Sequence, residues 1–210
     1  MNIYLLRHGE TEGNKNKFYY GKLNMSLNEN GKTQAKNAGI LLKNINFKNI
    51  YISERKRTRE TAEIVLGRTE GFIIDSRINE INFGEFEGRS YEEIQKKFPI
   101  EYEKWSSNWK EFVPPGGESY IQFYSRVRNF MKELLETGEE DVLVVTHGGV
   151  IRAVYCYVLD NNLDFYWKFS SENGDLSIIK YEYGNLFIDS ITHAGKLKEY
   201  MEGQVWRIEK

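Results

Sequence analysis

The chain has 210 residues, of which 40% are hydrophobic and 29% are charged. These values are ordinary for a globular protein, and the length allows one large domain or two small ones with a substantial buried core. With 29 basic and 31 acidic residues the formal net charge is -2, which indicates neither a nucleic acid nor a membrane surface as partner. No signal peptide or membrane-spanning run is evident, so we expect a cytoplasmic protein.

The predicted elements alternate between strands and helices. Short apolar runs without strict alternation are typical of strands that are buried on both faces, and they occur at 3–6, 49–52, 72–74 and 142–145. Helical spacing of apolar residues predicts helices at 28–42, 57–66, 119–135 and 148–159. Two further runs, 176–181 and 186–191, flank a Tyr183-Gly184-Asn185 turn and predict a hairpin. The order predicts an α/β fold with a mostly parallel sheet.

Residues 88–117 are rich in aromatic residues and do not continue the alternation of strands and helices. An aromatic stripe at steps of four and three residues predicts a single helix, and it consists of Phe98, Tyr102, Trp105, Trp109 and Phe112. The Pro-Pro-Gly-Gly run at 114–117 ends that helix. The stripe is compatible with a helix packed on the core and with a cap that leans over a pocket. Since no repeat or linker is present, we predict a single domain, 1–210, with a helical insertion at 88–117.

Two of the three histidines occupy equivalent positions. His8 and His147 each follow a predicted strand and each precede a glycine, Gly9 or Gly148. Open α/β sheets bind ligands beyond the carboxyl ends of their strands, so the two histidines are predicted to share a site. Glycines at such junctions allow close approach of backbone to a ligand and leave helix N–H groups free to meet an anion.

Arginines indicate what that ligand is. Arg7 is adjacent to His8, and a basic cluster lies at another strand-to-helix junction, 53–62, where at least one arginine is expected to point at the strand ends. The planar guanidinium group presents paired donors that match phosphate oxygens. Asn14 adds a neutral donor. Two histidines with arginines, and without the spacing of metal ligands, predict a phosphate-binding site.

The stretch Leu5-Leu6-Arg7-His8-Gly9-Glu10-Thr11, followed by Asn14, resembles the signature of the histidine phosphatase superfamily, which has the phosphoglycerate mutase-like fold. Four further blocks follow in the family's order, at 53–62, 78–88, 115–119 and 144–149. The second block selects Arg57, the third places the family's acid at Glu80, and the last contains His147. One departure is Arg55, where the family usually has an apolar residue. The resemblance implies a three-layer α/β/α sandwich.

The resemblance also implies a mechanism. His8 would attack phosphorus and form a phosphohistidine, with a pKa lowered by Arg7, Arg57 and a helix N-terminus so that it stays neutral. The phosphate oxygens would be held by Arg7, Asn14, Arg57, His147 and Gly148, with space provided by Gly9. Glu80 would protonate the leaving oxygen and then activate water. No cofactor or metal is implied, and the expected partner is a small-molecule phosphate ester.

Within the superfamily two reactions remain open, hydrolysis of a phosphomonoester and the phosphoryl shift of a cofactor-dependent phosphoglycerate mutase. The Thr-His-Gly-Gly block at 146–149 and the Glu-Gly-Arg-Ser-Tyr run at 87–91 favour the phosphatase branch. The overall pattern is most similar to α-ribazole phosphatases of cobalamin biosynthesis. The same motifs are also compatible with a broad-specificity phosphatase and with a binding protein that lacks activity. The oligomeric state is left open, with a homodimer as one option.

Several other features have simpler interpretations. Glu87 is interpreted as a carboxylate that orients an arginine or caps a turn, and Cys156 as a buried apolar side chain. His193 is interpreted as structural, and the near P-loop at 26–33 as an ordinary helix start. A zinc site formed by His8, Glu10 and His147 is disfavoured because Arg7 would repel the cation.

Overall fold

The computed structural model describes residues 1–194, and six strands in this part of the chain form one sheet in the order β3-β2-β4-β1-β5-β6. The strands are β1 (Asn2–Arg7), β2 (Asn49–Ile52), β3 (Ile73–Ile74), β4 (Asp141–Thr146), β5 (Leu176–Glu182) and β6 (Asn185–Thr192). The pairs β3/β2, β2/β4 and β4/β1 are parallel, whereas β5 and β6 extend the sheet in antiparallel fashion. The predicted mostly parallel sheet is confirmed.

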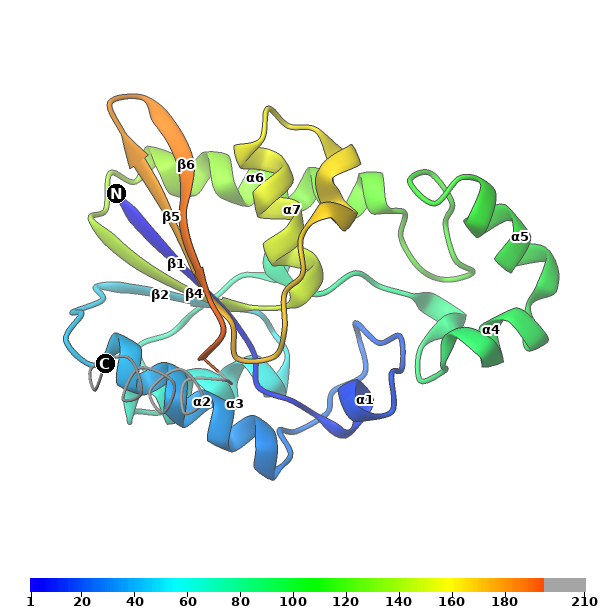
Figure 1. The fold of residues 1–210 in the computed structure, drawn as a ribbon, viewed down its shortest axis with the longest axis horizontal. Helices are drawn as coiled ribbons and strands as arrows, with labels where there is room; N and C mark the ends of the chain where they lie inside the picture. The colour runs from blue at the N-terminus through cyan, green and yellow to red at the C-terminus, as the bar shows by residue number, and fades with distance from the viewer. Residues whose placement is uncertain (195–210) are drawn as a thin grey trace, which may run out of the picture.

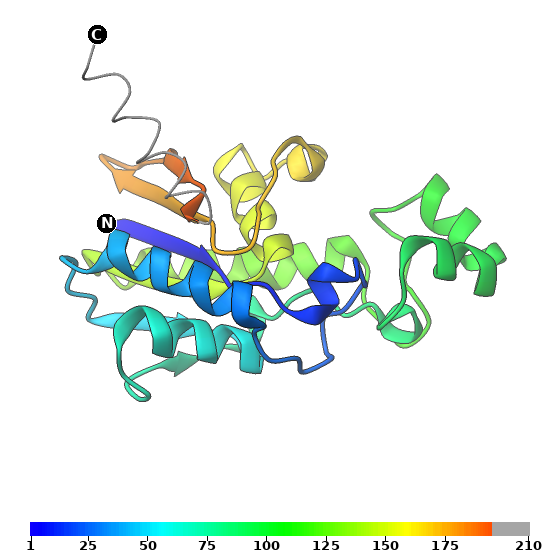
Figure 2. The ribbon, with the colours of Figure 1, turned by 60° about the horizontal axis from the view of Figure 1, so that its bottom comes forward.

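Helices cover both faces of this sheet (Figure 1). They are α1 (Glu12–Lys15), α2 (Glu29–Leu42), α3 (Lys56–Leu66), α4 (Tyr91–Lys97), α5 (Pro99–Ser107), α6 (Tyr120–Glu136) and α7 (Gly148–Val158). Short 3₁₀ turns occur at Ser76–Ile78, Gly84–Phe86 and Leu163–Lys168. The turned view in Figure 2 shows α2 and α3 on one side of the strands and α6 and α7 on the other. The three-layer α/β/α sandwich is therefore confirmed.

The central strand β4 is buried on both faces, which accounts for its continuous apolar sequence. Val142 and Val144 belong to the core on the α6/α7 face, while Leu143 and Val145 belong to the core on the α2/α3 face. A fully buried aliphatic side chain contributes roughly 1.5–3 kcal/mol relative to exposure. Both layers of helices thus pack against the same strand, through alternate residues of β4.

The predicted strand at 72–74 and the predicted hairpin agree with the structure to different extents. The run at 72–74 is predicted to be buried, but β3 has only two residues at the edge of the sheet, and the side chains of Ile73 and Ile74 are exposed. An edge strand has no neighbour to cover its outer side, so the prediction of burial was wrong there. The predicted hairpin is confirmed, and Tyr183 and Gly184 form its two-residue turn with positive φ angles of 52° and 77°.

The aromatic stripe does not lie on one helix, and this prediction was wrong. Pro99 interrupts it, because proline lacks an N–H and its ring clashes inside a helix. Helix α4 ends before Phe98, and α5 begins at Pro99, the position where proline is tolerated. Trp109 and Phe112 lie beyond the end of α5.

The aromatic residues of the insertion nevertheless pack together. Phe86 is fully buried, and its ring centroid lies 5.2 Å from that of Phe98, 5.7 Å from Trp105 and 6.1 Å from Phe112. These contacts attach α4 and α5 to the remainder of the described chain. In Figure 1 the two helices project at the end of the molecule opposite the β5/β6 hairpin.

The first turn of α2 lies against the segment that follows β1. Asn28 caps this helix by accepting a hydrogen bond from the Gly31 N–H at 2.8 Å. A Cβ on Gly31 would lie 2.1 Å from the carbonyl oxygen of Glu10, and a Cβ on Gly9 would lie 2.2 Å from that of Gly31. The two backbones can meet only because neither residue has a side chain, and this contact fixes the segment next to His8.

Substitution of Gly31 tests this contact. Alanine is the better helix former, by about 1 kcal/mol, and helix propensity alone would predict stabilisation. Because the new Cβ would overlap backbone, we expect Gly31→Ala to lower the free energy of unfolding by at least about 2 kcal/mol in urea denaturation. Gly39→Ala in the same helix is the control, since its Cβ would be 3.1 Å from Val65 O. Equal stability of the two variants would contradict this packing.

Candidate active site

The parallel pairing of β1 with β4 brings the two histidines together. Arg7 is opposite Thr146 in the register, so His8 and His147 are the next residues of two neighbouring strands. The His8 N–H donates to the Thr146 carbonyl at 2.9 Å. The two imidazole rings are 5.1 Å apart between centroids, at 66° to each other. The predicted shared location of the histidines is therefore what the fold produces.

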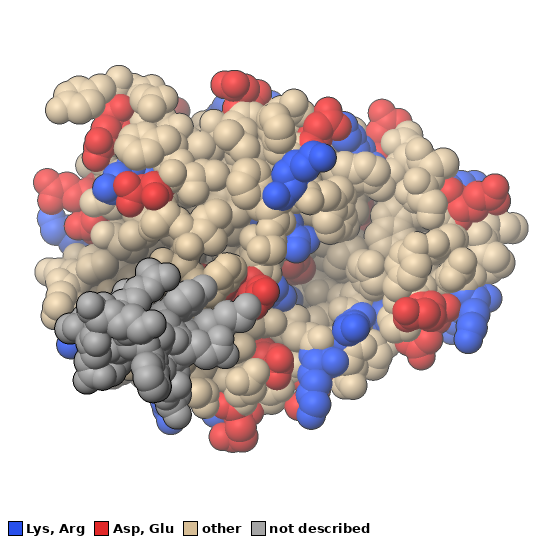
Figure 3. Space-filling view, in the orientation of Figure 1, with Lys and Arg blue, Asp and Glu red and all other residues tan. Residues whose placement is uncertain are grey.

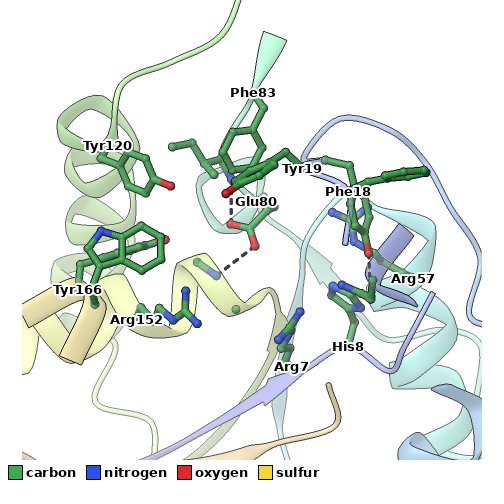
Figure 4. Close-up of a pocket in the computed structure, with 16 residues that line it drawn as sticks. Arg7, His8, Phe18, Tyr19, Arg57, Glu80, Phe83, Tyr120, Arg152 and Tyr166 are labelled. Atoms are coloured by element: carbon green, nitrogen blue, oxygen red, sulfur yellow. Dashed lines mark hydrogen bonds between the residues drawn. The ribbon is translucent and has the colours of Figure 1, made fainter. Parts of the chain in front are cut away.

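A cavity of about 280 Å³ opens at this edge of the sheet. Six of the predicted residues line it: Arg7, His8, Asn14, Arg57, Glu80 and Gly148. Figure 3 shows a hollow in the surface between the sheet with its helices and the insertion, with Lys and Arg side chains along its edge. Figure 4 shows the side chains that surround the cavity. Gly9 is not among the lining residues. The expectation that Gly9 makes room for phosphate was wrong, because its open side faces Gly31 of α2.

His8 is held as a neutral imidazole with one free nitrogen. Its Nδ1 lies 2.7 Å from the carbonyl oxygen of Gly9, which can only accept, so the proton is assigned to Nδ1. Burial is the largest cause that holds the pKa of His8 well below its usual range, and the positive charges of Arg57 and Arg7 lower it further. The lone pair on Nε2 is then available at neutral pH.

Arg57 is completely buried beside the histidines. Its Nη1 donates to the Leu23 carbonyl at 2.9 Å and its Nη2 to the Gly21 carbonyl at 3.2 Å. The guanidinium also lies 4.6 Å from the ring centroid of Tyr20. Burial lowers the pKa of Arg57 to about 10. The group therefore remains a cation at neutral pH, fixed at the wall of the cavity.

His147 lies behind this arginine and does not line the cavity. Its Nδ1 accepts a hydrogen bond from Arg57 Nε at 3.2 Å, and its Nε2 donates to Ser53 Oγ at 2.8 Å. Burial, followed by the charge of Arg57, lowers the pKa of His147 well below its usual range. Both nitrogens are thus engaged with protein, and His147 acts on the site through Arg57 in this structure.

Arg7 retains donors for a ligand. Its Nη1 donates to the Ser171 carbonyl, while its buried Nε has no hydrogen-bond partner among residues 1–194. Burial lowers the pKa of Arg7, and the charge of Glu80 acts in the opposite direction. A buried donor without a partner is costly, by about 1–3 kcal/mol, unless a ligand satisfies it.

Asn14 is oriented so that its amide nitrogen is available. Its Oδ1 accepts hydrogen bonds from Tyr20 Oη at 2.8 Å, from Thr11 N at 3.1 Å and from Asn173 Nδ2 at 3.2 Å. With the oxygen so occupied, Nδ2 is the polar atom that the side chain can offer to the cavity.

Glu80 is anchored at the N-terminus of α7, as the dashed lines in Figure 4 show. Its carboxylate accepts from Gly149 N at 3.1 Å and from Ile81 N at 3.0 Å. A Cβ on Gly149 would lie 2.1 Å from Glu80 Oε1. The second glycine of the Thr-His-Gly-Gly block is therefore needed to admit the carboxylate.

The Pro-Gly-Gly-Glu-Ser block contributes to the same placement. Arg126 of α6 donates to the backbone carbonyls of Asn79 and Glu80 at 2.7 and 3.1 Å. Glu118 holds Arg126 through a 2.7 Å ion pair and also accepts from Asn82 N at 2.9 Å. These contacts fix the segment that carries Glu80 from outside the cavity.

Glu87 orients Arg57 through a loop. Its carboxylate accepts from the backbone N–H groups of Gly21, Lys22 and Leu23 at 3.1, 2.7 and 2.8 Å. Gly21 and Leu23 are the residues whose carbonyls hold Arg57. Glu87 therefore fixes both carbonyls that receive the guanidinium, in agreement with its interpretation as a carboxylate that orients an arginine.

Several cavity residues are not singled out by any predicted motif. They include Arg152 of α7 and the aromatic residues Phe18, Tyr19, Tyr20, Tyr120, Tyr166 and Trp167. Arg152 could have been found from helical spacing, because it lies four residues after Gly148 and so on the same helix face. The aromatic residues come from separate elements, and no local pattern connects them.

Other candidate residues lie away from the cavity. Arg55 is 3.9 Å from Glu54 in an ion pair, and His193 Nδ1 is 2.9 Å from Asp175 Oδ1. Cys156 is fully buried, and burial raises its pKa to about 12. Glu10 accepts from Asn28 Nδ2 at 2.8 Å.

Residues 1–194 contain no cluster of three or more His, Cys, Asp or Glu side chains that could hold a metal ion. Within this same part of the chain, no helix is both long and apolar enough to cross a membrane.

Comparisons with known proteins identify the family of this chain. The model of the histidine phosphatase superfamily, branch 1, matches residues 3–193. An adenosylcobalamin/α-ribazole phosphatase of Salmonella typhimurium is 34% identical over 181 residues, which cover 85% of this chain and 90% of the relative. Phosphoserine phosphatase 1 of Hydrogenobacter thermophilus is 35% identical over 184 residues, covering 87% of each chain.

A solved structure is also similar. The α-ribazole phosphatase of Shigella flexneri superposes with a TM-score of 0.87 at 28% identity, over 92% of this chain and 97% of that one. The chain belongs to the histidine phosphatase superfamily, as the resemblance predicted. It is a phosphoric monoester hydrolase.

The buried histidines predict a dependence of stability on pH. In the folded protein His8 and His147 have pKa values well below 6.5, so the unfolded chain binds more protons at acid pH. The free energy of unfolding should fall below pH 6.5, by up to about 1.4 kcal/mol per pH unit for each histidine. Urea denaturation at a series of pH values between about 5 and 7.5 gives the free energy of unfolding as a function of pH. For His147→Gln the slope of this dependence should be shallower, by the equivalent of about one bound proton. An unchanged slope would show that His147 is not kept neutral.

The role of Glu87 can be tested with a near-isosteric change. Glu87→Gln leaves one oxygen to accept where the carboxylate offers two, and it places an NH₂ against backbone donors. Hydrogen bonds to charged groups are worth about 1.5–3 kcal/mol, so we expect kcat/KM for phosphate esters to fall at least tenfold. Glu85→Gln, an exposed neighbour, is the control and should behave as wild type. Wild-type kinetics in Glu87→Gln would refute the proposal that Glu87 positions Arg57 through the Gly21–Leu23 loop.

Proposed function

We propose that the protein hydrolyses phosphomonoesters through a phosphohistidine on His8. The observation that carries the proposal is the hydrogen bond from His8 Nδ1 to the Gly9 carbonyl, which leaves Nε2 unprotonated at the cavity. Attack of Nε2 on phosphorus forms the N–P bond as the P–O bond to the leaving alcohol breaks. Glu80, on the cavity wall, protonates the leaving oxygen and then takes a proton from the water that cleaves the N–P bond.

The cations around His8 supply the electrostatic part of this mechanism. Arg7, Arg57, Asn14 and the backbone at Gly148 hold the phosphoryl oxygens, and a well-placed donor of this kind is worth about 3 kcal/mol in the transition state. His147 contributes by holding Arg57 and lies close to His8. No metal or cofactor is needed, because fixed cations already surround the transferred group.

For the substrate we infer α-ribazole 5′-phosphate. This inference is supported by the similarity to enzymes named for that activity, over 85% and 92% of this chain. On this proposal the enzyme acts in the cytoplasm and belongs to cobalamin biosynthesis.

One observation favours a second candidate, an ester that carries a further anion, such as phosphoserine. Arg152 lines the cavity, and its buried Nε has no hydrogen-bond partner among residues 1–194. A carboxylate on the leaving alcohol would satisfy it. Phosphoserine phosphatase 1 of H. thermophilus is among the similar proteins.

The test is phosphate release from α-ribazole 5′-phosphate, phosphoserine, 3-phosphoglycerate and an aryl phosphate, with isomerisation of 3-phosphoglycerate followed in parallel. We expect hydrolysis that survives a chelator, and acid-labile label on His8 after brief exposure to labelled substrate. His8→Ala should lower the rate by at least about a thousandfold, as loss of a nucleophile does. Strong isomerisation with little phosphate release would identify a mutase, and substantial activity in His8→Ala would overturn the mechanism.

A further inference from the structure

A second cavity adjoins the one that contains His8. Its volume is about 200 Å³, and its lining consists of Tyr19, Tyr91, Trp105, Ser106, Trp109 and Trp167. Tyr19 and Trp167 line both cavities, so the two spaces share a wall formed by these residues. Five of the six lining side chains are aromatic, and the sixth is small. We call this space the aromatic side cavity.

The walls of the aromatic side cavity are held by ring contacts. Trp105 packs edge-on against Tyr19, with centroids 5.3 Å apart, and Trp109 packs edge-on against Trp167 at 5.8 Å. Trp109 also packs edge-on against Tyr120, with centroids 5.1 Å apart. The insertion therefore supplies Trp105 and Trp109 to a wall that continues to the edge of the catalytic cavity.

The exposure of these rings is unusual for a structural cluster. Trp167 is 53% exposed and Tyr91 is 44% exposed. Large exposed apolar side chains that gather around a concavity mark a binding site rather than a core. A cavity of about 150 Å³ with apolar walls can bind benzene, so the aromatic side cavity has room for a larger planar ring.

We propose that the aromatic side cavity binds a planar bicyclic heteroaromatic ring carried by the leaving alcohol of the substrate. The inference rests on the proposed hydrolysis at His8, since the phosphate would occupy the first cavity while the ring occupies the second. A ring linked to phosphate through a sugar fits this arrangement, because the sugar would pass the shared wall formed by Tyr19 and Trp167. Aromatic walls recognise such a ring by stacking and edge contacts, worth about 0.5–1.5 kcal/mol for each pair.

The location of Arg152 agrees with the assignment of the phosphate to the first cavity and of the ring to the aromatic side cavity. Its guanidinium lies 5.3 Å from the ring centroid of Trp167 and 6.0 Å from that of Tyr166. The cation therefore lies beside the shared wall, on the side of the catalytic cavity (Figure 4). The aromatic side cavity itself has no charged lining residue, which suits a neutral ring and not a second anion.

The experiment compares two esters, α-ribazole 5′-phosphate and ribose 5-phosphate, which has a hydroxyl group in place of the ring. Ser106→Phe fills the aromatic side cavity, and Ser107→Phe adds the same bulk at an exposed neighbour outside its lining. We expect Ser106→Phe to raise KM for α-ribazole 5′-phosphate about tenfold and to leave ribose 5-phosphate unchanged. Ser107→Phe should match wild type with both esters. Trp167→Ala should lower the preference for the ring-bearing ester by a similar factor.

A binding measurement separates this proposal from the proposed function. Free α-ribazole should quench the tryptophan fluorescence of wild type, and Ser106→Phe should lose this quenching even if no ester is hydrolysed. Failure of hydrolysis with intact quenching would overturn the proposed substrate and leave the ring site supported. If Ser106→Phe changes neither the ratio of kcat/KM for the two esters nor the quenching, the ring site is wrong. A change in oligomeric state with an unchanged ratio would instead assign the cavity to a second copy of the chain.

Discussion

The parallel pairing of β1 and β4 is the constraint on which the active site depends. It places Arg7 opposite Thr146, so that each strand delivers a histidine to the same edge of the sheet. Both strands are covered by apolar layers on two faces, and a slip of one residue would exchange those faces. The hydrophobic core therefore fixes the separation of His8 from His147 through the register of the two strands.

Burial determines the charge state of the site. Arg57 remains a cation although it is completely buried, because two loop carbonyls and His147 accept its hydrogen bonds. The same burial, together with the two arginines, keeps His8 neutral. A neutral imidazole thus lies beside fixed positive charges, which is the arrangement that the proposed transfer of an anionic phosphoryl group requires.

The supporting contacts come from segments that are distant along the chain. Glu87 fixes the loop that receives Arg57, and Arg126 fixes the backbone that carries Glu80. The insertion supplies aromatic side chains to the wall of the cavity that adjoins the one with His8. The proposed reaction would take place at the edge of the sheet, whereas the leaving group would be recognised largely by the insertion and by the 3₁₀ turn at Leu163–Lys168.

Sequence alone determined the alternation of strands and helices, and it paired Arg7 and His8 with His147, because these depend on local periodicity and on short motifs at strand ends. The family resemblance added Arg57 and Glu80 to the candidate set. The sequence also predicted helical structure within 88–117, although Pro99 divides the predicted single helix into α4 and α5. Tertiary structure decided the partners of each group. It placed His147 behind Arg57, assigned Gly9 to a backbone contact with α2, and brought Arg152 and the aromatic residues to the cavity. These contacts join residues far apart in the chain, and their geometry follows from strand order and register, which no local pattern encodes.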